Sequence, residues 1–76
     1  MFNRVKKEDG KWYILSPKGE YGGFEEIVRD NGEFVTPEGP QREFVVKKEG
    51  KYWILRFEIP SCEKVAELGP YIDIQF

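Results

Sequence analysis

The chain has no histidine and a single cysteine, and these absences remove most of the usual catalytic and metal chemistry. Histidine is the commonest general base and the commonest metal ligand, and zinc sites are built from cysteine and histidine. The one cysteine, Cys62, also excludes an internal disulfide, the covalent link of many small secreted domains. We therefore expect no enzyme, no metal and no cofactor, and a buried, unreactive Cys62 in a reducing, cytoplasmic setting.

Long apolar segments are missing as well. The longest apolar runs, residues 12–15 and 52–55, are far shorter than the roughly 20 residues that cross a bilayer. The first residues are basic and lack the apolar core of a signal peptide. We expect neither a membrane segment nor an export signal, and a chain of 76 residues predicts one domain spanning residues 1–76.

Charge alternates along the chain although the net charge is only −2. Residues 1–18 carry +3, residues 19–40 carry −5, residues 41–56 carry +3 and residues 57–76 carry −3. The acidic segment between the two basic ones offers a surface that would steer a basic partner, or the basic face of another copy.

The two basic segments contain nearly the same phrase. Residues 5–15 read Val-Lys-Lys-Glu-Asp-Gly-Lys-Trp-Tyr-Ile-Leu, and residues 46–55 repeat it without the aspartate and with the two aromatic residues exchanged. Glycine after acidic residues, between alternating apolar residues, is typical of a β-hairpin turn. The repeat predicts two related hairpins, with strands at residues 2–7, 11–16, 41–48 and 51–59.

The strand expected at residues 51–59 has the clearest alternation in the chain. One face carries the four side chains that we expect in the core: Trp53, Leu55, Phe57 and Ile59. The opposite face carries Tyr52, Ile54 and Arg56. In the earlier copy Trp12 and Tyr13 point to opposite faces that are both apolar, so alternation leaves the core side of that strand open.

Between the hairpins the pattern is less decisive. Residues 17–23 hold three glycines and predict a turn or loop. Residues 24–28 have apolar side chains at helical spacing, but the Asn31-Gly32 dipeptide favours a hairpin of residues 25–30 with residues 33–36. One or two helical turns are the alternative, and the prolines at 37 and 40 predict a stiff loop after Thr36.

Near the C-terminus we expect a short helix that begins at Ser61, a suitable N-cap, and ends at Gly69-Pro70. Residues 71–76 alternate and predict a closing strand. Strand, turn, strand, short helix and final strand is the layout of the second half of an SH3-like barrel. The fold class is therefore mainly β, either a small SH3-like barrel or a strongly bent antiparallel sheet of about 5–7 strands with one short helix before the last strand. The alternative class is α+β.

Protein binding is the function that this pattern favours. Tyrosine, tryptophan and arginine dominate interface hot spots, and the face opposite the expected core carries Tyr52 and Arg56. The candidate residues for a protein partner or a homo-oligomer are Trp12, Tyr13, Tyr52, Ile54 and Arg56. We expect a small non-enzymatic binding module, of the size of accessory, regulatory or inhibitor proteins such as those of phages.

Single-stranded nucleic acid is the alternative partner. Lysines pair with phosphates while neighbouring rings stack on bases, and the repeat places both kinds of side chain together. The candidate residues are Lys6, Lys7, Lys11, Lys47, Lys48 and Lys51. A sequence pI near 5.2 is low for such a binder, so these lysines would have to act as a local patch.

Overall fold

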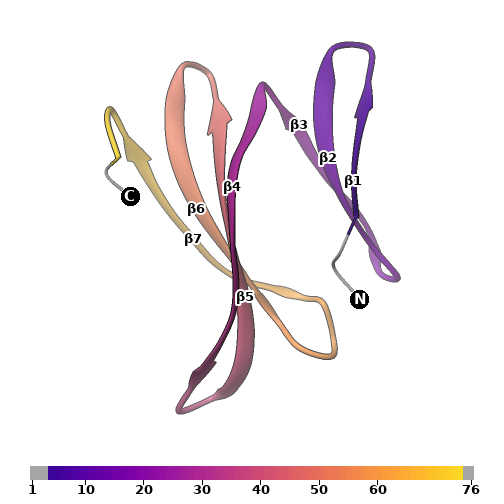
Figure 1. Cartoon of the computed structure of the whole chain (residues 1–76), viewed down its shortest axis with the longest axis vertical. Coiled ribbons are helices and arrows are strands. Elements are labelled where there is room, and N and C mark those ends of the chain that lie inside the picture. The colour runs from indigo at the N-terminus through magenta and orange to yellow at the C-terminus, as the bar shows by residue number, and fades with distance from the viewer. Residues whose placement is uncertain (1–3, 75–76) are drawn as a thin grey trace.

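A computed structural model describes residues 4–74, and every regular element among them is a β-strand. The strands form two antiparallel sheets in which neighbours follow chain order (Figure 1). Sheet A contains β1 (Arg4–Glu8), β2 (Lys11–Ser16) and β3 (Gly19–Phe24). Sheet B contains β4 (Glu26–Thr36), β5 (Gly39–Lys48), β6 (Lys51–Glu58) and β7 (Lys64–Tyr71). The mainly β prediction is confirmed, whereas an SH3-like barrel is not.

The two sheets are connected at both ends. At one end only Glu25 separates β3 from β4, and its N–H donates a hydrogen bond to the Lys47 carbonyl at 2.8 Å (Figure 1). At the other end the Tyr21 hydroxyl of β3 donates to the carbonyl of Cys62, which lies between β6 and β7, at 3.4 Å. Lys18 and Glu63 add an ion pair at 3.4 Å beside that contact. These links hold the inner faces of the sheets against each other.

The hydrophobic core lies between those inner faces. Sheet A, sheet B and the β6–β7 loop all contribute to its buried cluster: Ile14, Phe24, Phe44, Val46, Leu55, Phe57 and Cys62. Phe57 is fully buried, and its ring meets the edges of Tyr21 from sheet A and Phe44 from sheet B, with centroids 5.1 and 5.9 Å away. The predicted core side of β6 is confirmed for Leu55 and Phe57, with Trp53 packed against the cluster, and the predicted burial of Cys62 is confirmed as well. Ile59, the fourth residue predicted in the core, lies beyond the end of β6, is half-buried and does not belong to the cluster.

The repeated phrase forms the two predicted hairpins. Both close through two residues with positive φ, Asp9-Gly10 in the first and Glu49-Gly50 in the second, as a type I′ turn requires. The strands of the second hairpin follow the prediction closely. In the first hairpin β1 begins at Arg4, and the two preceding residues of the predicted strand lie outside the described residues.

The turn or loop predicted at residues 17–23 is confined to Pro17 and Lys18, and its extension over residues 19–23 is wrong, because these residues belong to β3. Pro17 and Lys18 make a two-residue turn in which the Ser16 hydroxyl accepts from the Lys18 N–H and donates to the Gly19 carbonyl. Thr36 repeats both bonds in the turn between β4 and β5. The phrase Ser/Thr-Pro-X-Gly therefore marks two hairpins, and glycine within β3 does not prevent pairing with β2.

The hairpin predicted around Asn31-Gly32 is also wrong, as is its helical alternative. Residues 26–36 form one long strand, β4, which is bulged at Val28 and at Asn31 and pairs with β5 throughout. Gly32 has φ of 81°, and its N–H donates to the Asp30 carboxylate at 2.9 Å. The dipeptide thus makes a bulge, which bends the strand but does not reverse the chain as a hairpin turn would.

The predicted C-terminal helix is wrong, since residues 64–71 form β7 along β6. Ser61 does not cap a helix: its hydroxyl donates to the Glu58 carboxylate at 2.6 Å, within a tight loop between the two strands. A helix of two turns is marginal by itself, whereas a strand at this place pairs with the backbone of β6. No helix occurs within residues 4–74, so the α+β alternative is wrong as well.

The closing strand predicted at residues 71–76 is not formed as expected. Only Tyr71 belongs to a strand, Ile72 lies in a bend with 87% of its surface exposed, and residues 75–76 lie outside the described residues. The alternation of this segment therefore does not reflect a buried face at Ile72.

Replacing the central core residue tests this packing. We expect Phe57→Ala to lower the free energy of unfolding by about 3–5 kcal/mol, because it removes a fully buried ring that contacts both sheets. Val35→Ala, at a side chain that is 85% exposed, should change it by less than about 0.5 kcal/mol. Urea unfolding followed by tryptophan fluorescence measures both, and similar losses for the two variants would contradict the placement of the core.

Candidate functional site

Sheet B has an apolar outer face in addition to its inner, core-facing one. Val45 is only 1% exposed, yet it lies outside the core cluster that contains its neighbours Phe44 and Val46. Successive strand residues point to opposite faces, so the Val45 side chain lies on the outer face, paired with Ile54 of β6. The outer face therefore has enough surrounding side chains to bury Val45 although this residue lies outside the core.

Two cross-strand pairs extend this face to the edge of the sheet. Ile54 is paired with Leu68 of β7, and Tyr52 is paired with Tyr71. Leu68 and Tyr71 are 36% and 39% exposed, so their apolar surface remains in contact with solvent. We refer to Tyr52, Ile54, Leu68 and Tyr71 as the outer patch.

Four of the six exposed large apolar side chains found within residues 4–74 lie between positions 65 and 72. They are Val65, Leu68, Tyr71 and Ile72. Exposed single apolar residues are ordinary, but a contiguous group on an edge strand is typical of an interaction site. β7 is therefore the strand of this fold that most resembles a surface for binding another protein.

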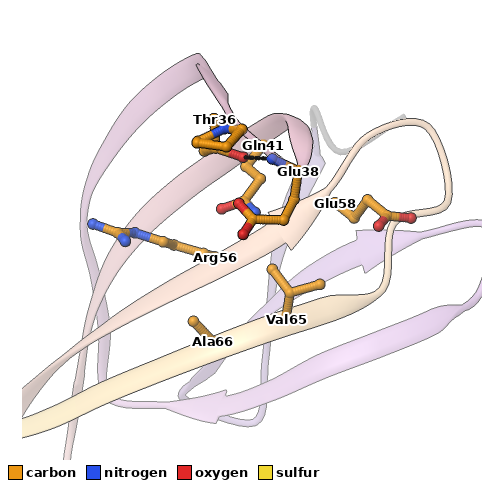
Figure 2. Close-up of a pocket in the computed structure, with 8 residues that line it drawn as sticks. Thr36, Glu38, Gln41, Arg56, Glu58, Val65 and Ala66 are labelled. Atoms are coloured by element: carbon orange, nitrogen blue, oxygen red, sulfur yellow. Dashed lines mark hydrogen bonds between the residues drawn. The ribbon is translucent and has the colours of Figure 1, made fainter.

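A hollow of about 600 Å³ lies beside the outer patch. The β4–β5 turn forms one wall, and β6 and β7 form the floor (Figure 2). Its lining residues are Thr36, Pro37, Glu38, Gln41, Arg56, Glu58, Val65 and Ala66. In Figure 2 the side chains of Val65 and Ala66 rise from β7 beneath the turn that carries Thr36 and Glu38.

A bulge in β7 gives the hollow its apolar floor. The pairing between β6 and β7 passes over Val65, so that Lys64 faces Phe57 while Ala66 faces Arg56. Val65 and Ala66 therefore both line the outer side although they are consecutive residues. A regular strand would have turned one of them inward.

The charge of Arg56 at this site is already balanced. Its Nε donates to Glu43 at 3.0 Å, and its guanidinium lies over the ring of Phe34 at 5.4 Å from the centroid. The Asn31 amide holds the other carboxylate oxygen of Glu43 at 2.7 Å. Arg56 is thereby held against β4, where it shapes one side of the hollow.

Asp30 and Arg42 fasten the β4–β5 hairpin that overhangs the hollow. The two side chains form an ion pair with two hydrogen bonds, and Asp30 also accepts from the Gly32 N–H. Partial burial acts to raise the pKa of Asp30, but the bonds from Arg42 and Gly32 outweigh it, and the pKa is lowered.

Three of the five residues predicted to bind a protein lie together. Tyr52, Ile54 and Arg56 share the outer face of β6, as the alternation predicted. Trp12 packs against the core from sheet A, and Tyr13 lies on the other face of that sheet, where its ring leaves no room for a Cβ at Gly22. The structure therefore does not bring Trp12 and Tyr13 to the outer patch.

Four of the six predicted lysines lie over aromatic rings, in the same order in both hairpins. The ammonium of Lys6 is 5.4 Å from the ring centroid of Tyr13, and that of Lys47 is 5.9 Å from Tyr52. The following lysine of each hairpin lies over the tryptophan: Lys7 at 5.8 Å from Trp12 and Lys48 at 5.1 Å from Trp53. Such contacts are worth about 0.5–1 kcal/mol at exposed sites.

The exchanged aromatic residues preserve this arrangement. The added Asp9 moves the first turn by one residue relative to the preceding lysines, which reverses the face of each position in the strand after the turn. Exchanging tryptophan and tyrosine compensates, so that Trp12 and Trp53 both pack against the core. The repeat therefore conserves which ring faces inward.

Lys6 is further restrained by carboxylates. Its ammonium pairs with Glu20 at 2.7 Å and with Glu8 at 2.8 Å, and these bonds raise the pKa of Lys6 above its ordinary value. In return, the ammonium lowers the pKa of Glu8. Much of the positive charge of this hairpin is thus balanced within sheet A.

Sequence reasoning missed the β7 half of the site. Val65, Ala66 and Leu68 were assigned to a helix, although the β-branched Val65 is a weak signal for a strand. The overhanging turn could have been found from the repeated Ser/Thr-Pro-X-Gly phrase.

Within residues 4–74, no group of three or more histidine, cysteine, aspartate or glutamate side chains could hold a metal ion. This part of the chain also contains no helix of the length and apolarity that crossing a membrane takes.

No family model matches the chain. Searches of curated proteins and of solved structures likewise found no match. The function is therefore inferred from the residues of the outer patch and the hollow.

The ion pair of Asp30 predicts a pH dependence. Since its folded-state pKa is lowered, the carboxylate stabilises the fold above about pH 4, and this contribution is lost as the pH falls through the folded-state pKa. Going from about pH 5 to about pH 2 should cost wild type more stability than Asp30→Asn, which has no carboxylate to protonate. Urea unfolding at the two pH values measures the difference, and equal losses would contradict it.

Proposed function

We propose that this chain is a non-enzymatic protein-binding module whose contact surface is the outer patch. The observation that carries the proposal is the pairing of Tyr52 with Tyr71 and of Ile54 with Leu68 on the outer face of sheet B, where Leu68 and Tyr71 remain 36% and 39% exposed. Two tyrosines and two aliphatic residues on one rigid sheet are typical of the centre of an interface.

The edge position of β7 supports the same function. Its outer backbone groups have no neighbouring strand among the described residues, so an extended partner segment could also pair with them. The partner is either a different protein or a second copy of this chain. As an accessory, regulatory or inhibitor protein it would act in a reducing, cytoplasmic compartment, in keeping with its free, buried Cys62.

A charge at the centre of the outer patch tests the proposal. We expect Leu68→Glu to weaken capture of the protein partner at least about tenfold, because a carboxylate would be desolvated in the contact. The side chain is 36% exposed, so the variant should fold, which circular dichroism verifies. Quantitative affinity capture measures binding, and light scattering on the purified chain shows whether a second copy is the partner.

The matched control is Val35→Glu, which adds the same charge at an exposed valine of β4 away from the patch. Unchanged partners and unchanged mass for Leu68→Glu would contradict binding through this face.

Single-stranded nucleic acid is a second candidate, and one observation favours it. Both lysine-bearing turns, at residues 9–10 and 49–50, lie at the same end of the molecule (Figure 1). Lys11 and Lys51 are exposed in these two hairpins. Protein binding is preferred because the other four lysines already lie over rings and each turn contains an acidic residue, Asp9 or Glu49.

This second candidate predicts salt-dependent binding of labelled single-stranded DNA. The logarithm of affinity should fall with the logarithm of salt concentration by about 0.7 for each phosphate contacted. Replacing both Lys11 and Lys51 with glutamine should reduce that slope, as fluorescence anisotropy at two salt concentrations would show. Absence of binding at low salt would exclude nucleic acid as the partner.

A further inference from the structure

The hollow beside the outer patch is lined by two carboxylates, those of Glu38 and Glu58, that do not pair with a cationic side chain of the described residues. Within residues 4–74, neither Glu38 nor Glu58 takes part in an ion pair. Glu58 accepts one hydrogen bond, from the Ser61 hydroxyl at 2.6 Å. The positive charge of Arg56 is balanced by Glu43, so it does not offset the two glutamates. The hollow is left with negative charge.

A second hollow shows that such charges are matched elsewhere. A space of about 260 Å³ lies between β3 and the inner side of sheet B, and it is also lined by two glutamates. There Glu20 pairs with Lys6 at 2.7 Å, and Glu67 pairs with Lys64 at 2.9 Å. The outer hollow differs from the inner one in having, among the described residues, no cation paired with its two glutamates, because its Arg56 pairs with Glu43 instead.

The rest of the outer hollow suits the stem of a long side chain. Pro37, Val65 and Ala66 supply apolar surface, and Val65 is 46% exposed. Arginine and lysine bury their methylene stems on such surfaces while the charged end stays among polar groups. Two polar residues of the lining are already engaged, Thr36 in the β4–β5 turn and Arg56 with Glu43. The other polar groups that line this space are Glu38, Glu58 and the amide of Gln41 (Figure 2).

We propose that the outer hollow receives a basic side chain, arginine or lysine, from the protein segment that covers the outer patch. The stem lies on Val65 and Ala66, and the charged end pairs with Glu38 and Glu58. This inference rests on the proposed function, since the hollow continues the outer patch along β7. The inference adds to that function the type of residue that the partner inserts, a basic one.

The spacing of β7 also sets the order of the partner's residues. Ala66 and Leu68 are two residues apart and both face outward, so an extended segment along β7 meets the hollow and the patch at alternate positions. The partner segment therefore carries a basic residue and an apolar residue with one residue between them.

Short peptides test the inference without knowledge of the natural partner. The probe is acetyl-Arg-Gly-Leu-amide, and the comparison is the same peptide with citrulline, which has the shape of arginine without its charge. Titration into isotope-labelled protein is followed by two-dimensional NMR of the backbone amides. We expect the arginine peptide to shift the resonances of residues 38, 58, 65 and 66, and the citrulline peptide to bind at least fivefold more weakly.

Variants that remove the charge of one glutamate show where the guanidinium group of the peptide binds. Glu38→Gln and Glu58→Gln should each weaken the arginine peptide at least threefold, whereas Glu33→Gln, the same change at an exposed residue of β4 outside the hollow, should leave it unchanged. Equal binding of the citrulline peptide, or shifts confined to other parts of the protein, would overturn the inference.

These outcomes are separable from those of the proposed function. Leu68→Glu alters the patch and leaves both carboxylates of the hollow in place. Loss of partner capture by that variant, with no effect of Glu38→Gln and Glu58→Gln on capture, would refute the basic side chain and retain the patch. Binding of the arginine peptide at the hollow with capture insensitive to Leu68→Glu would refute the patch as the protein interface.

Discussion

The contact on which the structure depends is the packing of Phe57 between rings from both sheets. Tyr21 reaches it from sheet A and Phe44 from sheet B, with interplanar angles of 62° and 79°, and such edge-to-face arrangements are favourable for aromatic rings. A sheet of three short strands has little stability by itself, so sheet A needs this shared core. The Tyr21 hydroxyl also reaches the β6–β7 loop, which ties the course of β7 to the same contact.

The inner face of β6 packs in that core, so the side chains on its outer face are not needed there and can contact another molecule. The bulged strand β4 carries its hairpin over this face, where Arg56 is held between Glu43 and Phe34. The result is an apolar patch that ends in an acidic hollow. Both features depend on strands that are irregular: a bulge at Asn31 bends the overhanging hairpin, and a bulge at Val65 makes the floor of the hollow apolar.

The same bulges explain where sequence reasoning failed. In β7 the extra residue places Lys64 and Glu67 on one face, three positions apart, and a spacing of three resembles a helix. In β4 the bulge at Val28 produces the helical spacing seen between residues 24 and 28. A bulge disrupts the hydrogen bonding between two strands locally. It forms where the pairing of the flanking residues and the burial of the core compensate for that loss, and neither is visible in a short window of sequence.

The sequence by itself determined the two tight hairpins and the inward face of β6, because these follow from local turn chemistry and strict alternation. It also indicated the burial of Cys62, because a free cysteine behaves as a small apolar residue. Only the tertiary structure decided which side chains share a surface. It separated Trp12 and Tyr13 from Tyr52, and it joined Leu68 and Val65 to the site. The reason is physical: the face on which a residue falls depends on the register of strands that are distant in the chain, and one inserted residue reverses it.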